Sequence, residues 1–172
     1  MARHAPARRL APATLTGVDV ERLDAEIREI LRARGMRVTS PRVTIHRLIR
    51  EKPAHFSAED LHHSVAEVLP GVSTQTIYAT LALFEELGLV RRVLAMSGAA
   101  MFDSRPDPHH HTSCRGCGAI ADLEAPAPMD GVLAVAQDAG FRPDGASVTV
   151  VGLCAACAAR GVAGLRRAPL AV

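Results

Sequence analysis

Between residues 19 and 87 the apolar side chains recur every three or four positions, the spacing of amphipathic helices. Helices are expected over 19–34 and from Ser40 to about Arg50, then from a capping-box variant at Ser57 and from Ser73. The apolar stripes are Leu23, Ile27, Ile30 and Leu31 in the first helix, Leu61, Val65, Val68 and Leu69 in the third, and Ile77, Leu81 and Phe84 in the fourth.

After Gly88 the pattern changes to short extended runs. Residues 89–95 and 100–102 flank Ser97-Gly98, which is a hairpin signal. Short helices followed by a hairpin are typical of a winged helix-turn-helix, whose last helix enters the major groove of DNA. A small helical domain that binds another protein has the same topology, so the pattern alone leaves both open.

Beyond Asp103 a short α/β unit is expected. Strands are predicted at 119–123 and 146–151, with an amphipathic helix over 129–139 between them. The inward face of that helix is predicted to be Met129, Val132, Leu133 and Ala136. The fold class is therefore α+β, with a winged-helix part followed by an α/β part.

Charge is nearly balanced at +2, but five basic side chains and one acid fall within residues 35–52. Such a basic face is a weak indication of nucleic-acid binding, and a solvated helix face explains it equally. The chain has no secretory segment and no apolar run long enough to span a bilayer, so we expect a cytoplasmic protein without a membrane partner.

The four cysteines form two CxxC pairs, Cys114/Cys117 and Cys154/Cys157. In a cytosolic chain such pairs indicate metal binding rather than disulfides. Two pairs separated by a strand–helix–strand segment predict a structural, tetrahedral four-cysteine zinc site. A redox dithiol has the same CxxC spacing, but two pairs and the lack of a clear active-site helix N-terminus favour zinc.

Three consecutive histidines precede the first cysteine pair. His109 and His111 are two residues apart on an extended segment and should point to one side, with His110 pointing away. With Asp103 and Asp122 nearby, they predict a mixed nitrogen and oxygen site suited to Fe²⁺, Mn²⁺ or Zn²⁺. A catalytic zinc site is the alternative, but the deaminase signature and a Glu beside the histidines are both missing, so we do not expect an enzyme.

Six ordered motifs resemble the ferric uptake regulator family of metal-dependent transcriptional repressors. They cover roughly residues 30–160 and read GMRVTSPR at 35–42, HFSAEDL at 55–61, VSTQTIYATL at 72–81, ELGLVRR at 86–92, HHHTSCRGCGAIADL at 109–123 and VVGLCAAC at 150–157.

The resemblance implies a homodimer that binds a double-stranded DNA operator of two-fold symmetry. It implies a disordered basic arm at 1–18, a winged-helix DNA-binding domain at 19–98, a hinge at 99–108, a dimerisation and metal-binding domain at 109–160, and a frayed tail at 161–172. One structural Zn²⁺ per subunit and a regulatory Fe²⁺ or Mn²⁺ are implied. The regulatory ligands carried over are His55, Asp103, His109, His111 and Asp122, and the expected DNA contacts are Arg37, Arg42, Thr74, Gln75 and Tyr78.

Asp at both 103 and 122 resembles the peroxide-responsive branch, and the histidine segment is similar to actinobacterial members associated with catalase-peroxidase genes. In that branch Fe²⁺ reacts with H₂O₂ and a ligand histidine is oxidised, here by analogy His55 or His109. The alternative is an iron-responsive repressor of metal uptake genes without oxidation chemistry. The chain departs from the family at Pro108, Met129 and Ala146, which replace ligands of a further metal site, and at Ala79, which replaces an Arg.

Overall fold

The computed structural model describes residues 17–51, 55–93, 100–105, 107–124 and 128–161. These residues form two compact units, the first made of residues 17–93 and 100–105 and the second of 107–161. Residues 1–16 of the predicted arm, the Ser97-Gly98 turn and residues 162–172 of the predicted tail lie outside the described residues.

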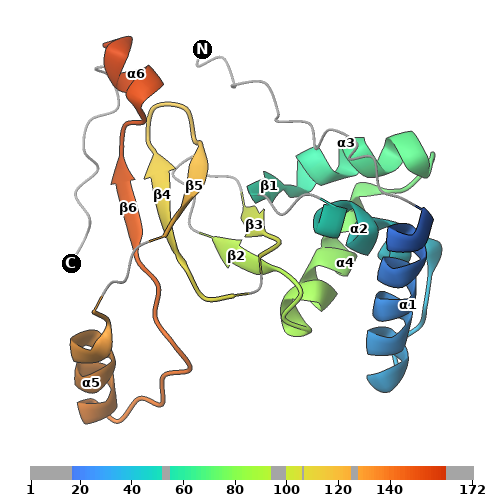
Figure 1. Cartoon of the computed structure of the whole chain (residues 1–172), viewed down its shortest axis with the longest axis horizontal. Coiled ribbons are helices and arrows are strands. Elements are labelled where there is room, and N and C mark those ends of the chain that lie inside the picture. Colours follow the sequence, from blue (N-terminus) through green and yellow to red (C-terminus); the bar gives the residue numbers. More distant parts are fainter. Residues whose placement is uncertain (1–16, 52–54, 94–99, 106, 125–127, 162–172) are drawn as a thin grey trace. The chain divides into compact units, whose positions relative to one another are not determined.

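The first unit is a winged helix-turn-helix, as the sequence predicts. Its helices are α1 (Gly17–Ala33), α2 (Ser40–Glu51), α3 (Ala58–Val68) and α4 (Thr74–Glu86). Three short strands, β1 (His55–Ser57), β2 (Arg91–Val93) and β3 (Met101–Asp103), form an antiparallel sheet in the order β1-β3-β2 (Figure 1). Strand β1 was not predicted, and β3 occupies part of the range expected to be the hinge.

Local hydrogen bonds explain where the helices of the helix-turn-helix begin. The Ser57 hydroxyl accepts from the Asp60 backbone N–H at 3.0 Å, and the Asp60 carboxylate accepts from the Ser57 N–H at 3.1 Å. This is the predicted capping box, and it satisfies donors at the helix start that otherwise lack partners. The Ser73 hydroxyl caps α4 in the same way by accepting from the Thr76 N–H.

Most residues of the predicted apolar stripes lie in the core of this unit, but Val68, predicted to lie on the stripe of α3, is 56% exposed at the last residue of that helix. Ile27, Leu31, Leu61, Ile77 and Phe84 are all fully buried. The core extends to the sheet, where Phe56 of β1 and Phe102 of β3 are direct cross-strand partners with stacked rings 6.1 Å apart. This packing fixes the register of the two strands and therefore which polar residues lie opposite each other.

The second unit consists of β4 (His110–Cys114), β5 (Ile120–Leu123), α5 (Asp130–Asp138), β6 (Thr149–Gly152) and α6 (Ala155–Ala159). Its sheet has the order β5-β4-β6, with β4 antiparallel to β5 and parallel to β6 (Figure 1). The predicted strands at 119–123 and 146–151 correspond to β5 and β6. Helix α6, which positions the second cysteine pair, was not predicted.

The expectation for α5 is wrong in one respect. The helix forms, but none of its residues is buried within the chain, and Val132, predicted to face inward, is 58% exposed. Val135 and Phe141 are also exposed. An exposed apolar face of this kind is typical of a contact surface.

None of the described helices is long and apolar enough to span a membrane.

Candidate metal centres and DNA-binding surface

The four cysteines converge at one end of the second unit. Their sulfur atoms all lie within 4.8 Å of one another, and Cys117 Sγ is 3.9 Å from Cys154 Sγ. All four are free thiols, and Cys114 and Cys157 are buried. A tetrahedral zinc ion with bonds of about 2.3 Å holds its sulfurs about 3.8 Å apart, so the donor set and spacing fit Zn²⁺.

The chain folds into this arrangement through two tight turns. Cys114 ends β4, and Gly118, with a φ of +74°, closes the first turn by donating its N–H to the Cys114 carbonyl at 2.8 Å. The second pair brackets the start of α6, with Cys154 as the N-cap. The Cys154 N–H donates to Cys114 Sγ at 3.2 Å, which joins the two CxxC turns directly.

The protonation states of the thiols differ. Burial raises the pKa of the Cys114 thiol, but backbone hydrogen bonds, the largest from Cys154, outweigh it and lower that pKa to about 6. For Cys117 the Ala119 N–H lowers the pKa, but burial and the neighbouring thiols raise it to about 12. A metal-free site therefore does not ionise fully near neutral pH, and zinc must displace protons as it binds.

The residues of the predicted regulatory site divide between the two units. In the first unit His55 and Asp103 are direct partners on the antiparallel strands β1 and β3. Opposed residues on such strands have Cβ atoms roughly 5 Å apart, which allows both side chains to reach one ion. Asp103 is 1% exposed and accepts a hydrogen bond from the Arg105 backbone N–H at 2.8 Å.

The second unit brings together His109, His111 and Asp122. The His109 and His111 rings lie 4.5 Å apart, as the alternation of an extended segment predicts. Asp122 is the β5 partner of His111, and its Oδ1 is 3.3 Å from His109 Nε2. The His109 Nδ1–H donates to the Asp107 carbonyl at 2.7 Å, which leaves Nε2 as the ring nitrogen through which a metal would be bound.

His110 points to other partners. Its Nδ1 accepts a hydrogen bond from the Val148 backbone N–H at 3.1 Å, next to the bond from His111 N to the Val148 carbonyl. The ring thus continues the hydrogen bonding between β4 and the segment entering β6. Its role in the described structure is to support the sheet.

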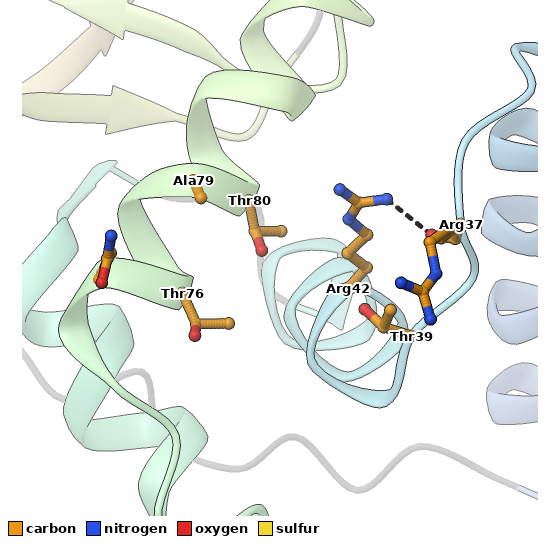
Figure 2. Close-up of a pocket in the computed structure, with 7 residues that line it drawn as sticks. Arg37, Thr39, Arg42, Thr76, Ala79 and Thr80 are labelled. Atoms are coloured by element: carbon orange, nitrogen blue, oxygen red, sulfur yellow. Dashed lines mark hydrogen bonds between the residues drawn. The ribbon is translucent and has the colours of Figure 1, made fainter.

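Three of the five expected DNA contacts, Arg37, Arg42 and Gln75, line a groove of about 460 Å³ between α4 and the start of α2. Figure 2 shows Arg37 and Arg42 on one side, facing Thr76 and Thr80 of α4. Arg42 Nη1 donates to the Arg37 carbonyl at 2.6 Å, which holds its guanidinium at the groove. The lining is Arg37, Thr39, Arg42, Gln75, Thr76, Ala79 and Thr80.

Two predicted contacts, Thr74 and Tyr78, do not line this groove, although both are exposed on α4 and Tyr78 is 52% exposed. Sequence reasoning missed Thr39, Thr76 and Thr80. Helical spacing could have identified Thr76, because it lies three residues before Ala79 on the same face. Thr39 carries no comparable signal.

Comparison with known proteins identifies the family. The model of the ferric uptake regulator family matches residues 33–151, well over half of the chain. The chain belongs to the ferric uptake regulator family. As such it is a metal-responsive transcriptional repressor rather than an enzyme, and it has the DNA binding and dimeric assembly of the family's regulators.

The similarity extends to several kinds of family member. "Ferric uptake regulation protein 1" of Mycolicibacterium fortuitum is 38% identical over 120 residues, covering 69% of this chain and 74% of the relative. The "peroxide operon regulator" of Bacillus subtilis is 29% identical over 132 residues, covering 77% and 91%. A solved zinc uptake regulator complexed with zinc and DNA is 26% identical with a TM-score of 0.59, covering 86% and 99%.

Proposed function

We propose that this ferric uptake regulator binds one Fe²⁺ or Mn²⁺ ion through His55, Asp103, His109, His111 and Asp122. The first two come from the DNA-binding unit and the last three from the second unit. The second group, with two imidazoles and one carboxylate, could hold an ion whose remaining positions are filled by water, whereas the two groups together supply five protein donors and leave little room for water.

Binding of one ion by both groups of residues would couple metal binding to DNA binding. An ion held by donors from two units stabilises one relative orientation of those units, and a dimer binds a two-fold operator only when its two recognition helices have the right separation. The structural Zn²⁺ of each subunit would be held by the four cysteines, and the operator would be a two-fold DNA site. A cytoplasmic location remains a prediction.

We further propose that hydrogen peroxide is the effector. The observation that supports this is the donor set, in which Asp103 and Asp122 are each placed beside imidazoles and no thiolate is included. Such nitrogen and oxygen donors suit Fe²⁺. An Fe²⁺ ion held there would supply the reducing power that cleaves the O–O bond of peroxide, and the ligand imidazole of His55 or His109 would be the group that gains one oxygen atom. Loss of that donor would release the metal and then the DNA.

For DNA contact we propose that Arg37 and Arg42 bind phosphates and that Thr74, Gln75 and Tyr78 contact the major groove. The groove beside Ala79 supports the assignment of the two arginines to phosphates and of the α4 side chains to the major groove. Its arginines lie on the wall opposite α4, and Gln75 projects from the first turn of α4. Glutamine pairs well with the edge of adenine, whereas guanidinium groups neutralise the backbone.

Mass spectrometry of Fe²⁺-loaded protein after a brief H₂O₂ pulse tests the effector. The expected result is addition of one oxygen atom to peptides containing His55 or His109, and none when Mn²⁺ replaces Fe²⁺. His63 is an internal control, because it is exposed on α3 and outside the donor set. Oxidation of His63 to the same extent would indicate reaction with peroxide in bulk solution and would refute the proposal.

Iron availability itself is the second candidate effector, and the similarity to a ferric uptake regulation protein favours it. It predicts DNA binding that depends on Fe²⁺ but survives the peroxide pulse, with no oxygen added to either histidine. A DNA-binding measurement on the same pulsed sample separates the two candidates.

A further inference from the structure

We propose that Arg160 protects the Cys157 thiolate of the four-cysteine site from oxidants such as hydrogen peroxide. Arg160 is the C-cap of α6, and its guanidinium Nη2 donates a hydrogen bond to Cys157 Sγ at 3.5 Å. Cys157 lies inside α6 and is 1% exposed with Arg160 in place. The arginine thus contributes a hydrogen-bond donor and a positive charge at this buried sulfur.

The two CxxC turns supply hydrogen bonds to sulfur in different ways. Cys114 Sγ accepts from the backbone N–H of Cys154. Around Cys157 the backbone is engaged in the helix, because Ala158 N donates to the Cys154 carbonyl and Arg160 N to the Ala156 carbonyl. Within the described residues, the N–H group that reaches Cys157 Sγ therefore comes from the Arg160 side chain.

The charge of the site determines whether Arg160 slows or speeds the oxidation of Cys157. Four thiolates around Zn²⁺ carry a net charge of −2, and each metal-bound sulfur keeps lone pairs that can attack peroxide. In that step sulfur forms a bond to one peroxide oxygen, the O–O bond breaks and hydroxide leaves. The sulfur becomes a sulfenic acid, oxidised by two electrons, and the peroxide is reduced. Because a metal-bound cysteine is already ionised, a nearby guanidinium cannot activate it by lowering its pKa. Its hydrogen bond to Cys157 Sγ instead withdraws electron density from the sulfur and makes it a weaker nucleophile.

Zinc release from the full-length protein tests the proposal. Regulatory metal is first removed with EDTA, so the result does not depend on how the regulatory site works. Zinc-loaded wild type, Arg160→Ala, Arg160→Lys and Arg142→Ala are then treated with H₂O₂, and released zinc is followed with a colorimetric chelator. Arg142→Ala is the matched control, since Arg142 is an exposed arginine of the same unit.

We expect Arg160→Ala to release zinc about three- to tenfold faster than wild type, a smaller effect than the roughly 10- to 100-fold typical of outer-shell partners because this arginine is exposed. Arg160→Lys should be intermediate, since it keeps the charge but loses the planar fork, and Arg142→Ala should match wild type. If Arg160→Ala is purified with less than full zinc, the lysine variant carries the comparison. Release at the wild-type rate from the fully loaded Arg160 variants would overturn the proposal.

Discussion

Gly116 lies between the cysteines of the first CxxC turn, where the backbone approaches Cys157 closely. A Cβ atom added at position 116 would lie 3.2 Å from both Cβ and Sγ of Cys157 and 3.0 Å from Leu153 Cδ2. The end of the Leu153 side chain can rotate away. Cys157 cannot, because zinc would hold its sulfur in place. We therefore expect Gly116→Ala to weaken zinc binding specifically.

The contact distances set the size of the effect. Contacts of 3.2 Å are shorter than the 3.4 Å at which ordinary van der Waals contact begins, so the two turns must separate by a few tenths of an ångström. Overpacking of this kind costs about 1–3 kcal/mol. If the cost falls on the zinc-bound form, zinc affinity drops by about 5- to 150-fold.

Competition with a chelator of known zinc affinity measures this directly. Gly152→Ala is the matched control, because Gly152 belongs to the same zinc-binding unit, pairs with Cys114 across the sheet, and has open space around its added Cβ. The control should bind zinc as wild type does. Zinc affinity of Gly116→Ala within about twofold of wild type would show that the two turns do not need this close approach.

Three further predictions concern other parts of the molecule. His46→Leu should raise the free energy of unfolding by about 1 kcal/mol at pH 7.5, because neither nitrogen of this fully buried ring has a well-formed hydrogen bond within the described residues. The gain should grow towards pH 5.5, as measured by urea denaturation. Burial lowers the pKa of His46 below 6.5, against the opposing charge of Glu26, so the unfolded chain binds more protons below pH 6.5 and wild-type stability falls there. His110→Ala should cost about 1 kcal/mol in the same assay while leaving zinc content unchanged, because the Val148 N–H loses its acceptor. Arg42→Ala should weaken binding to operator and scrambled DNA alike and reduce the salt slope by about one, as measured by fluorescence anisotropy.

Matched variants separate these effects from general damage. His63→Leu makes the same chemical change at an exposed position and should not stabilise the protein, so equal stabilisation by both variants would contradict the argument from burial. Loss of zinc from His110→Ala would show that the ring supports the zinc-binding unit more broadly than its one hydrogen bond indicates. Arg28→Ala, on the exposed face of α1, should leave DNA binding unchanged.

The helices of the first unit could be predicted because their signals are local. Each apolar stripe repeats within one segment, and the caps at Ser57 and Ser73 lie within three residues of their partners. Strand β1 could not be predicted in this way. It has three residues and exists because His55, Phe56 and Ser57 pair with residues more than 40 positions later. No pattern within so short a segment distinguishes it from a loop.

The distinction between signals within one segment and contacts between distant segments also applies to the candidate sites. The CxxC spacing predicted the four cysteines whose sulfurs the fold brings together, since each pair is local and the chemistry of thiolates is specific. Gly116 supports them through its close approach to Cys157, which depends on how the two turns pack. Arg160 reaches Cys157 through α6, a helix that was not predicted. The inward face predicted for α5 is wrong because apolar periodicity shows only that a helix has a face to bury. It does not show whether the same chain or a second copy buries it.

The pairing of β3 with both of its neighbours has a consequence for how members of this family could diversify. Asp103 is aligned with His55 on one side and with Arg91 on the other. The neighbouring Phe102 is fully buried, and a slip of β3 by one residue would turn its ring out of the core, so burial of one face of the sheet holds this register. Substitutions elsewhere in this sheet would therefore leave the His55–Asp103 pair aligned as long as position 102 keeps a buried apolar side chain.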